Sequence, residues 1–141
     1  MTQPSAAAAS TGARLPDEIR AFLAAPRFAT IATLDADGSP HQAVIWYALE
    51  GDSLLVNSRA ERHWPRNLDR DGRVAVAVYD SHEPYHFVGL KGRAERIRDG
   101  DAALEDIYGL ARRFGRSPDR YQGQARVTYR LVIDGVFDYR S

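Results

Sequence analysis

The alternation of apolar and polar residues predicts a small antiparallel sheet with a few helices. Residues that alternate as in half-buried strands fall into six runs: 28–34, 41–49, 53–57, 73–79, 85–97 and 126–139. Apolar residues recur at helical spacing in segments 15–25 and 101–114. A short helix is also expected over 65–70, because Pro65 suits a first turn and Asp71-Gly72 can end the helix. The polar segment 115–124 is predicted to be a loop. The pattern therefore indicates a mainly β, α+β fold.

Turn residues set the order in which the strands pair. Gly38 ends an Asp-rich turn after the first run, and Gly51 lies in a second turn after the second run. We therefore expect the first three strands to form an antiparallel meander. Gly89 and Gly92 predict a bulge or a barrel corner, and Asp134-Gly135 is expected to break the last strand. Because closing an antiparallel sheet removes its edges, a small barrel with attached helices is expected.

Composition limits the possible chemistry. The chain has 141 residues, 44% of them hydrophobic, and no cysteine, which excludes thiol catalysis, Cys-ligated zinc and iron–sulfur clusters. Nineteen basic residues balance nineteen acidic ones, so no overall field attracts nucleic acid. No apolar run approaches the roughly 18–20 residues of a membrane span. We expect a disordered tail over residues 1–13, one domain over 14–141 and a cytoplasmic location.

The segment from His82 to His86 spells the H-E-x-x-H pattern of zinc proteases. That pattern binds zinc when both histidines lie on one face of a helix. Pro84 removes a helical hydrogen-bond donor and moves Glu83 away from helical backbone angles. We therefore expect a hairpin loop here and no metal site.

The run 73–79 has valines on one face and the small residues Ala75 and Ala77 on the other. A face of small residues admits a flat molecule close to the sheet, and it suits core packing equally well. The sequence leaves these two interpretations open.

The most basic part of the chain lies between the third and fourth predicted strands. Its cationic residues are Arg59, Arg62, His63 and Arg66. Arginine presents a fork of N–H donors that matches phosphate oxygens, and a helix that starts nearby adds free backbone N–H groups. We therefore predict a phosphate site here, although a solvated charged connection fits the local pattern as well.

Several motifs in a fixed order carry a resemblance to a known superfamily. They are Ala32 to His41, Trp46-Tyr47, Arg66 to Val74, Pro84-Tyr85 and Lys91 to Ala94. Together they resemble the flavin/deazaflavin split-barrel superfamily, and within it the pyridoxamine-phosphate-oxidase-like proteins that use the deazaflavin coenzyme F420. The resemblance covers nearly the whole chain. It implies a six-stranded antiparallel split β-barrel that forms a homodimer, with the cofactor in a groove between the subunits.

The resemblance also assigns roles to particular residues. It implies a cofactor ring lined by Val44, Ile45, Trp46 and Tyr47, with Asn57 and Ser58 beside it. It implies a phosphate held by Arg59, Arg62, His63 and Arg66, with Asn67 nearby. Many members carry lysine where this chain has Trp64. A nearby arginine could supply the missing charge, Trp64 could stack on the cofactor, or the phosphate site could be degraded.

The function that the resemblance implies is that of an F420-dependent reductase, which transfers hydride from the reduced deazaflavin to a small unsaturated organic acceptor. Two alternatives stay open: an FMN-binding oxidoreductase of the pyridoxamine-phosphate-oxidase type, and a non-catalytic protein that binds flavin or F420. No catalytic acid or base is assigned, because the cofactor carries out the hydride chemistry. Residues that could orient the substrate or give a proton are Tyr47, His41, Tyr85 and His86.

Overall fold

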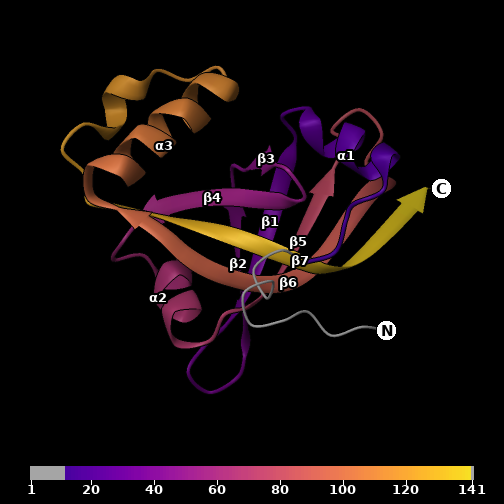
Figure 1. The fold of residues 1–141 in the computed structure, drawn as a ribbon, viewed down its shortest axis with the longest axis horizontal. Helices are drawn as coiled ribbons and strands as arrows, with labels where there is room; N and C mark the ends of the chain where they lie inside the picture. Colours follow the sequence, from indigo (N-terminus) through magenta and orange to yellow (C-terminus); the bar gives the residue numbers. More distant parts are fainter. Residues whose placement is uncertain (1–11, 141) are drawn as a thin grey trace.

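The computed structural model describes residues 12–140, whose elements are drawn in Figure 1. The helices are α1 (Asp17–Ala24), α2 (His63–Arg70), α3 (Gly100–Arg113) and the 3-10 helix η1 (Pro118–Tyr121). The strands are β1 (Phe28–Leu34), β2 (Pro40–Ile45), β3 (Ala48–Glu50), β4 (Ser53–Arg59), β5 (Arg73–Tyr79), β6 (His86–Asp99) and β7 (Arg126–Arg140). No helix in this part of the chain has the length and hydropathy needed to cross a membrane.

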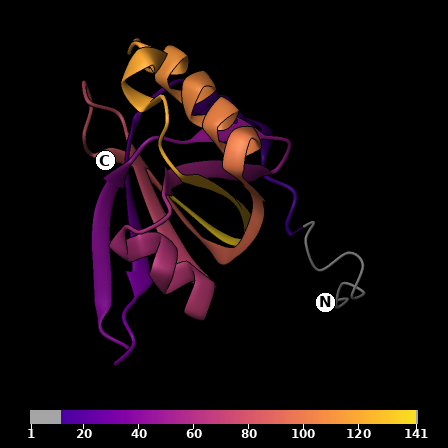
Figure 2. The ribbon, with the colours of Figure 1, turned by 90° about the vertical axis from the view of Figure 1, so that its left-hand side faces the viewer.

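All of these strands belong to one antiparallel sheet. Its order is β2-β1-β5-β6-β7-β4-β3, so β2 and β3, which are neighbours in the sequence, lie at opposite edges. Only Trp46 and Tyr47 connect the two edges. Figure 2 shows that the sheet curls until the purple β1 and β2 face the orange and yellow β6 and β7. The sheet is thus a barrel whose hydrogen-bond ladder stays open between its edges.

The prediction of one strand over 41–49 is wrong, because this run divides into β2 and β3. β2 pairs with β1, while β3 pairs with β4. The predicted meander is therefore two separate hairpins, and the sheet has seven strands where six were expected. The break coincides with Tyr47, whose fully buried side chain donates a hydrogen bond from its hydroxyl to Ala25 O at 2.8 Å. This contact anchors the connection against the end of α1.

The long strands β6 and β7 pair along almost their full length, with a register shift at Lys91/Gly92. The predicted bulge at Gly92 is therefore confirmed. A Cβ on Gly92 would lie 1.9 Å from Val132 O, so only glycine permits this close approach. The predicted break at Asp134-Gly135 is wrong, because β7 continues through these residues. The register shift opposite Lys91 and Gly92 is a bulge within the paired strands.

The helices match the predicted segments with shifted ends. α1 buries Ile19, Phe22 and Leu23, which share one face of the helix. α2 begins at His63, two residues before the predicted start, and Pro65 lies in its first turn, where a helix needs no N–H donor. The predicted loop over 115–124 contains η1.

The interior of the curled sheet is apolar. Val74, Val76 and Val78 of β5 are buried, and each contributes about 1.5–3 kcal/mol by leaving water. Ala75 and Ala77 face outward, and Ala77 is exposed. The core-packing interpretation of these alanines is therefore wrong, and they form part of the outer surface of the barrel.

The tail predicted over residues 1–13 lies mostly outside the described residues, which begin at residue 12. Ala13 is described, and its N–H donates to Ile133 O at 2.7 Å. The end of the predicted tail is thus hydrogen-bonded to β7.

Candidate functional site

The basic stretch divides between the end of β4 and the start of α2. β4 runs two residues past the predicted strand end, so Ser58 and Arg59 belong to it, and Arg62 occupies the N-terminal cap position of α2. Arg59 pairs with Glu61 at 2.9 Å. Within residues 12–140, the guanidinium groups of Arg62 and Arg66 form no hydrogen bond or ion pair. These two groups are therefore available to an anion.

A cavity of about 250 Å³ lies beside Arg62, between β2, β4, α2 and β7. Seven of the residues that the resemblance assigns to the cofactor line it: Val44, Ile45, Trp46, Asn57, Ser58, Arg62 and Trp64. The other lining residues are Ile107, Tyr121 and Arg126. We refer to this space, which holds Arg62 and Arg126, as the arginine cavity.

Arg126, the first residue of β7, lines the arginine cavity but was not among the candidate site residues predicted from the sequence. It is 8% exposed; its Nε donates to Asn57 Oδ1 at 2.9 Å and its Nη1 donates to Gln124 Oε1 at 2.8 Å. No carboxylate within residues 12–140 forms an ion pair with it. Burial, together with the like charges of Arg62 and Arg59, lowers the pKa of Arg126 to about 10. A buried cation with like-charged neighbours and no acid is typical of a site for an anion.

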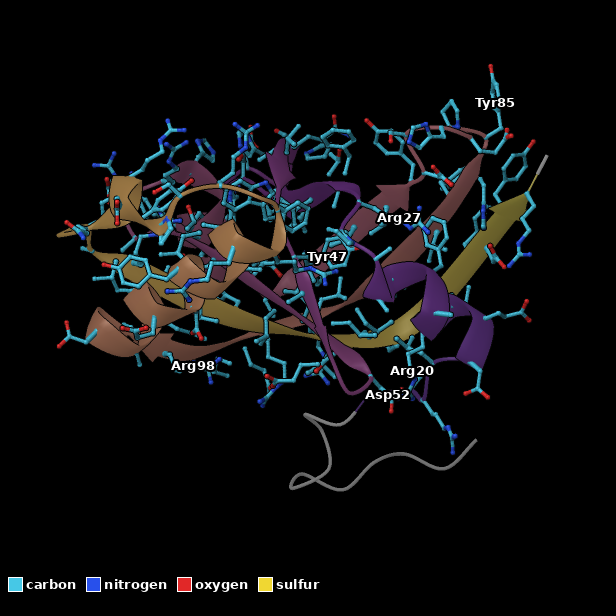
Figure 3. The ribbon with its side chains drawn as sticks, turned by 90° about the horizontal axis from the view of Figure 1, so that it is seen from above. Arg20, Arg27, Tyr47, Asp52, Tyr85 and Arg98 are labelled. Carbon is cyan, nitrogen blue, oxygen red and sulfur yellow. The ribbon has the colours of Figure 1, made fainter. Side chains whose placement is uncertain are left out.

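Asn57 holds Arg126 in place. Its Nδ2 donates to a backbone carbonyl of α3 and to Thr128 Oγ1, each at 2.8 Å. Thr128 Oγ1 donates in turn to Asp106 Oδ2 at 2.7 Å, and Arg98, labelled below α3 in Figure 3, donates to the same oxygen at 2.7 Å. Because this network uses both N–H groups of Asn57, the amide oxygen is fixed in the direction of Arg126.

Aromatic rings form the walls of the arginine cavity. Trp46 stacks on Phe114 with ring centroids 5.4 Å apart, and it meets Tyr121 edge-on at 6.2 Å. The Tyr121 ring also lies 5.4 Å from the guanidinium carbon of Arg126. Val44 is 78% exposed on the edge strand β2, so the cavity opens along that edge. Aromatic walls beside cationic groups suit a flat ring that carries a phosphate.

Trp64 occupies the position where the resemblance leads us to expect lysine. It is 6% exposed, and its ring packs against Tyr129 with centroids 6.2 Å apart. The Tyr129 hydroxyl donates to Asp69 Oδ1 at 2.6 Å, and burial, together with this carboxylate, raises the pKa of Tyr129. Most of the indole is therefore part of the core, where it packs α2 against β7, and only one edge of the ring lines the arginine cavity.

Three of the predicted cofactor residues lie on the other side of α2. A cavity of about 460 Å³ there is lined by Asp35, Ala36, Asp37, His63, Arg66, Asn67 and Arg70. His63 Nε2 lies 2.7 Å from Asp35 Oδ1, and Asn67 Nδ2 donates to the same oxygen at 2.9 Å. The hydrogen bonds from Asn67 and His63 lower the pKa of Asp35. We refer to this space as the aspartate cavity.

The basic residues predicted to form one phosphate site are thus not contiguous. Arg62 lines the arginine cavity, whereas His63, Arg66 and Asn67 line the aspartate cavity. Tyr47 and Arg59 line neither space. The carbonyl of Tyr47 accepts a hydrogen bond from an arginine of α3 at 3.0 Å, so this part of the ring-binding segment is engaged by the protein itself.

The residues considered as proton donors all lie outside the arginine cavity. Tyr47 is fully buried, and burial raises its pKa. Tyr85 is 67% exposed and points away from the body of the molecule in Figure 3. His86 is half-buried, with its ring 4.4 Å from a phenylalanine ring of α1. His41 stacks on His63 beside the aspartate cavity.

The segment that spells H-E-x-x-H forms the predicted hairpin loop. Residues 82–85 lie in the loop that connects β5 to β6, and His86 is the first residue of β6. No helix therefore brings His82 and His86 to one face.

The outer surface of the barrel carries a third cavity, of about 450 Å³, which is mainly apolar. Small residues, among them Ala75, Ala77 and Gly89, form its floor, and Phe137 stands at its side. Phe137 is 57% exposed, and its ring packs beside Phe87 at 5.9 Å. An exposed apolar area of this kind marks a surface that binds another molecule.

Comparison with known proteins places the chain in one family. The sequence profile of the pyridoxamine 5'-phosphate oxidase family matches residues 15–137. An F420H(2)-dependent biliverdin reductase from Mycobacterium tuberculosis (strain CDC 1551 / Oshkosh) is 30% identical over 111 residues, which are 77% of this chain and 78% of that protein.

Solved structures show the same fold. An F420 reductase superposes with a TM-score of 0.75 at 23% identity, over 87% of this chain and 98% of that chain. A conserved hypothetical protein, Rv2991 from Mycobacterium tuberculosis, superposes with a TM-score of 0.74 at 24% identity, over 98% of this chain and 89% of that chain. The chain therefore belongs to the pyridoxamine 5'-phosphate oxidase family of oxidoreductases, and its fold is the split barrel.

Proposed function

We propose that this protein is an F420-dependent reductase, which transfers hydride from the reduced deazaflavin to a small unsaturated organic acceptor. The relative named as an F420H(2)-dependent reductase supports the choice of cofactor. We place the cofactor in the arginine cavity, because two cationic side chains and aromatic rings meet there. The cytoplasmic location stays a prediction.

The observation that carries the proposal is the pair of cationic side chains at the arginine cavity. Arg126 is almost fully buried and has no acidic partner within residues 12–140, and Arg62 lies at the N-terminus of α2 with its guanidinium equally unpaired. F420 and FMN both carry a phosphate, which would neutralise these two charges and accept hydrogen bonds from them. In this arrangement Arg62 and Arg126 replace the lysine that Trp64 displaces.

The remaining residues of the cavity would position the ring. Trp46 and Val44 offer apolar surface beside the cationic end of the cavity. β2 is an edge strand, so alternate backbone N–H and C=O groups on its free side can bond the ring edge without any particular side chain. When bound, the cofactor supplies the hydride chemistry, and these residues hold the ring and exclude water from one of its faces.

The size of the cavity supports a second subunit. At about 250 Å³ the arginine cavity is smaller than the roughly 300–1,000 Å³ of most small-molecule sites, and it opens beside the exposed Val44. We propose that a homodimer completes the groove, with the apolar outer surface at Ala77 and Phe137 as the contact between the subunits. Phe137→Asp should then convert a dimer into a monomer in light scattering coupled to gel filtration. An unchanged mass would exclude this surface as the interface.

An FMN-binding oxidoreductase is the second candidate function. The family profile that matches the chain is that of the pyridoxamine 5'-phosphate oxidases, and this favours it. A protein that binds flavin or F420 without catalysis is the third possibility, since Tyr47, His41, Tyr85 and His86, the residues considered as proton donors, do not line the arginine cavity.

Paired titrations of the protein with oxidised F420 and with FMN test which cofactor it binds, with fluorescence anisotropy or quenching as the readout. Micromolar binding of F420 with much weaker binding of FMN is the expected result. The reverse preference would move the assignment to FMN, and binding of neither would overturn the cofactor proposal. Oxidation of reduced F420 by a panel of unsaturated acceptors then separates the enzyme from the carrier. Arg112→Glu, on the exposed side of α3, is the matched control for charge changes in the cavity.

A further inference from the structure

We propose that Asp35, His41 and His63 form a binding site for a divalent transition metal ion, with zinc as the ion that best suits it. Each residue offers one ligand atom, and the three ligand atoms all lie within 4.8 Å of one another. The inference is independent of the proposed cofactor, because these residues lie outside the arginine cavity.

The three residues come from separate elements that the fold brings together. His41 lies on β2 opposite Thr33 of β1, and Asp35 follows two residues after Thr33. His63 is the first residue of α2, which packs against β1 and β2. The two imidazole rings stack with centroids 4.1 Å apart and an angle of 11° between their planes. The site therefore joins the β1–β2 hairpin to the start of α2.

A second layer of hydrogen bonds holds the carboxylate. Asn67, which is 2% exposed, donates from Nδ2 to Asp35 Oδ1 at 2.9 Å and to Thr33 Oγ1 at 3.0 Å. Arg70 donates to Asn67 Oδ1 at 2.7 Å, which fixes the amide orientation. Ligands of protein metal sites are typically oriented by such partners. Asn67 is thus a positioning residue for the site.

The donor set determines the kind of metal. Two imidazole nitrogens and one carboxylate oxygen suit zinc and the later first-row metals, whereas calcium and magnesium prefer oxygen ligands alone. Three protein ligands leave a fourth position for water or for an anion. Arg66 and Arg70 line the aspartate cavity, as Asp35 and His63 do. Their positive charges should limit the affinity for the metal ion to about the micromolar range.

Side-chain rotation alone can form the site. Bonds of about 2.0–2.2 Å to a tetrahedral ion place ligand atoms about 3.4 Å apart. The present distance of 2.7 Å between His63 Nε2 and Asp35 Oδ1 would lengthen to this spacing, and the ligand atoms of all three residues already lie within 4.8 Å of one another. The His63 side chain is 58% exposed, which leaves it free to rotate toward the ion.

The test uses full-length protein without an affinity tag, freed of metal by a chelator and then titrated with zinc by calorimetry. We expect one zinc ion to bind per chain, and cobalt to give the visible absorption bands of a tetrahedral site. His41→Ala and His63→Ala should each weaken binding by at least about tenfold, and Asn67→Ala by about tenfold.

His82→Ala is the matched control, because His82 is an exposed histidine in the loop after β5, at the opposite end of β1 from Asp35. It should bind zinc as the wild-type chain does. Equal binding by His41→Ala, or an equal loss in His82→Ala, would overturn the site and indicate adventitious binding. If His63→Ala does not fold, His41→Gln provides the test, with circular dichroism as the check on folding. Zinc that raises the melting temperature of the wild-type chain but not of His41→Gln would support the site.

Discussion

The two sides of α2 carry opposite electrostatic arrangements, although the residues concerned are neighbours in the sequence. On one side, Arg62 and Arg126 have no acidic partner within residues 12–140. On the other side, His63 and Asn67 both contact the carboxylate of Asp35. The first side therefore carries two cations without an acidic partner, whereas on the second side the carboxylate is paired and, within residues 12–140, the guanidinium of Arg66 is without a partner.

The difference arises from the geometry of the helix. Successive residues of an α-helix are about 100° apart around its axis, so Arg62 at the cap and His63 at the first position leave the chain in different directions. A cluster of charges in a sequence is thus not a cluster in space. The charged residue beside Arg62 in the arginine cavity is instead Arg126, which β7 brings from the far end of the chain.

The largest expected effect is that of Arg62→Glu on cofactor affinity. The substitution removes a charge-assisted contact and adds a repulsive charge, which should weaken binding by about 2–4 kcal/mol, or on the order of 100-fold. Arg66→Glu, on the other side of α2, should weaken it by about fivefold or less. Fluorescence titration with the cofactor measures both variants. Equal losses in the two variants would remove the distinction between the two cavities.

Asn67→Ala should have the largest effect on stability. Asn67 is 2% exposed and forms hydrogen bonds to Thr33, Asp35 and Arg70. Removing these bonds should lower the free energy of unfolding by about 1–3 kcal/mol. Urea denaturation in metal-free buffer measures this change. A variant as stable as the wild-type chain would show that the hydrogen bonds of Asn67 do not stabilise the aspartate cavity.

Arg126→Gln should separate binding from stability. The variant removes a buried cation but keeps an N–H donor for Asn57, so the free energy of unfolding should stay the same or rise by about 1 kcal/mol. Cofactor affinity should fall by about tenfold.

The pH dependence of this variant gives a second measurement. The unfolded chain keeps the Arg126 proton up to the ordinary pKa of arginine, whereas burial in the folded chain lowers the pKa of Arg126 to about 10. Wild-type stability should therefore rise relative to Arg126→Gln as the pH increases through this range. A lower stability of Arg126→Gln at neutral pH would show that the guanidinium is structural.

The smallest effect is expected for His63→Ala in metal-free buffer. The His63 side chain is 58% exposed, and exposed ion pairs contribute about 0–1 kcal/mol. Thermal unfolding should therefore change little, and cofactor affinity should change little as well. A loss of affinity as large as that of Arg62→Glu would place His63 in the phosphate site that the resemblance implied.

The hairpins were predictable because their signals are local. Gly38 and Gly51 adopt φ values of +87° and +61°, which glycine adopts at no steric cost, and each one marks a turn between paired strands. The break between β2 and β3 was not predictable in this way. Residues 41–49 favour a strand throughout, and the break coincides with the burial of Tyr47 against α1, which depends on the tertiary structure.

The arginine cavity was predictable only in part. The resemblance identified Trp46, Asn57 and Arg62, whose positions follow from short segments near the basic stretch. Arg126 lies far along the chain, and its place in the cavity depends on the register that pairs it with Arg59 in β4. The sequence shows Arg126 only as a polar residue at the start of a largely apolar run. That pattern does not reveal which strand lies beside Arg126.

The position of β7 between β6 and β4 has a consequence for synthesis on the ribosome. The chain emerges from its N-terminus, so residues up to the end of α3 are available for folding before β7 is complete. Until then β4 has only β3 as its hydrogen-bonded neighbour, and the inner edges of β4 and β6 are open to unwanted pairing. The arginine cavity is therefore among the last parts of the protein to be completed, and a nascent chain that stops before β7 lacks the wall that holds Arg126.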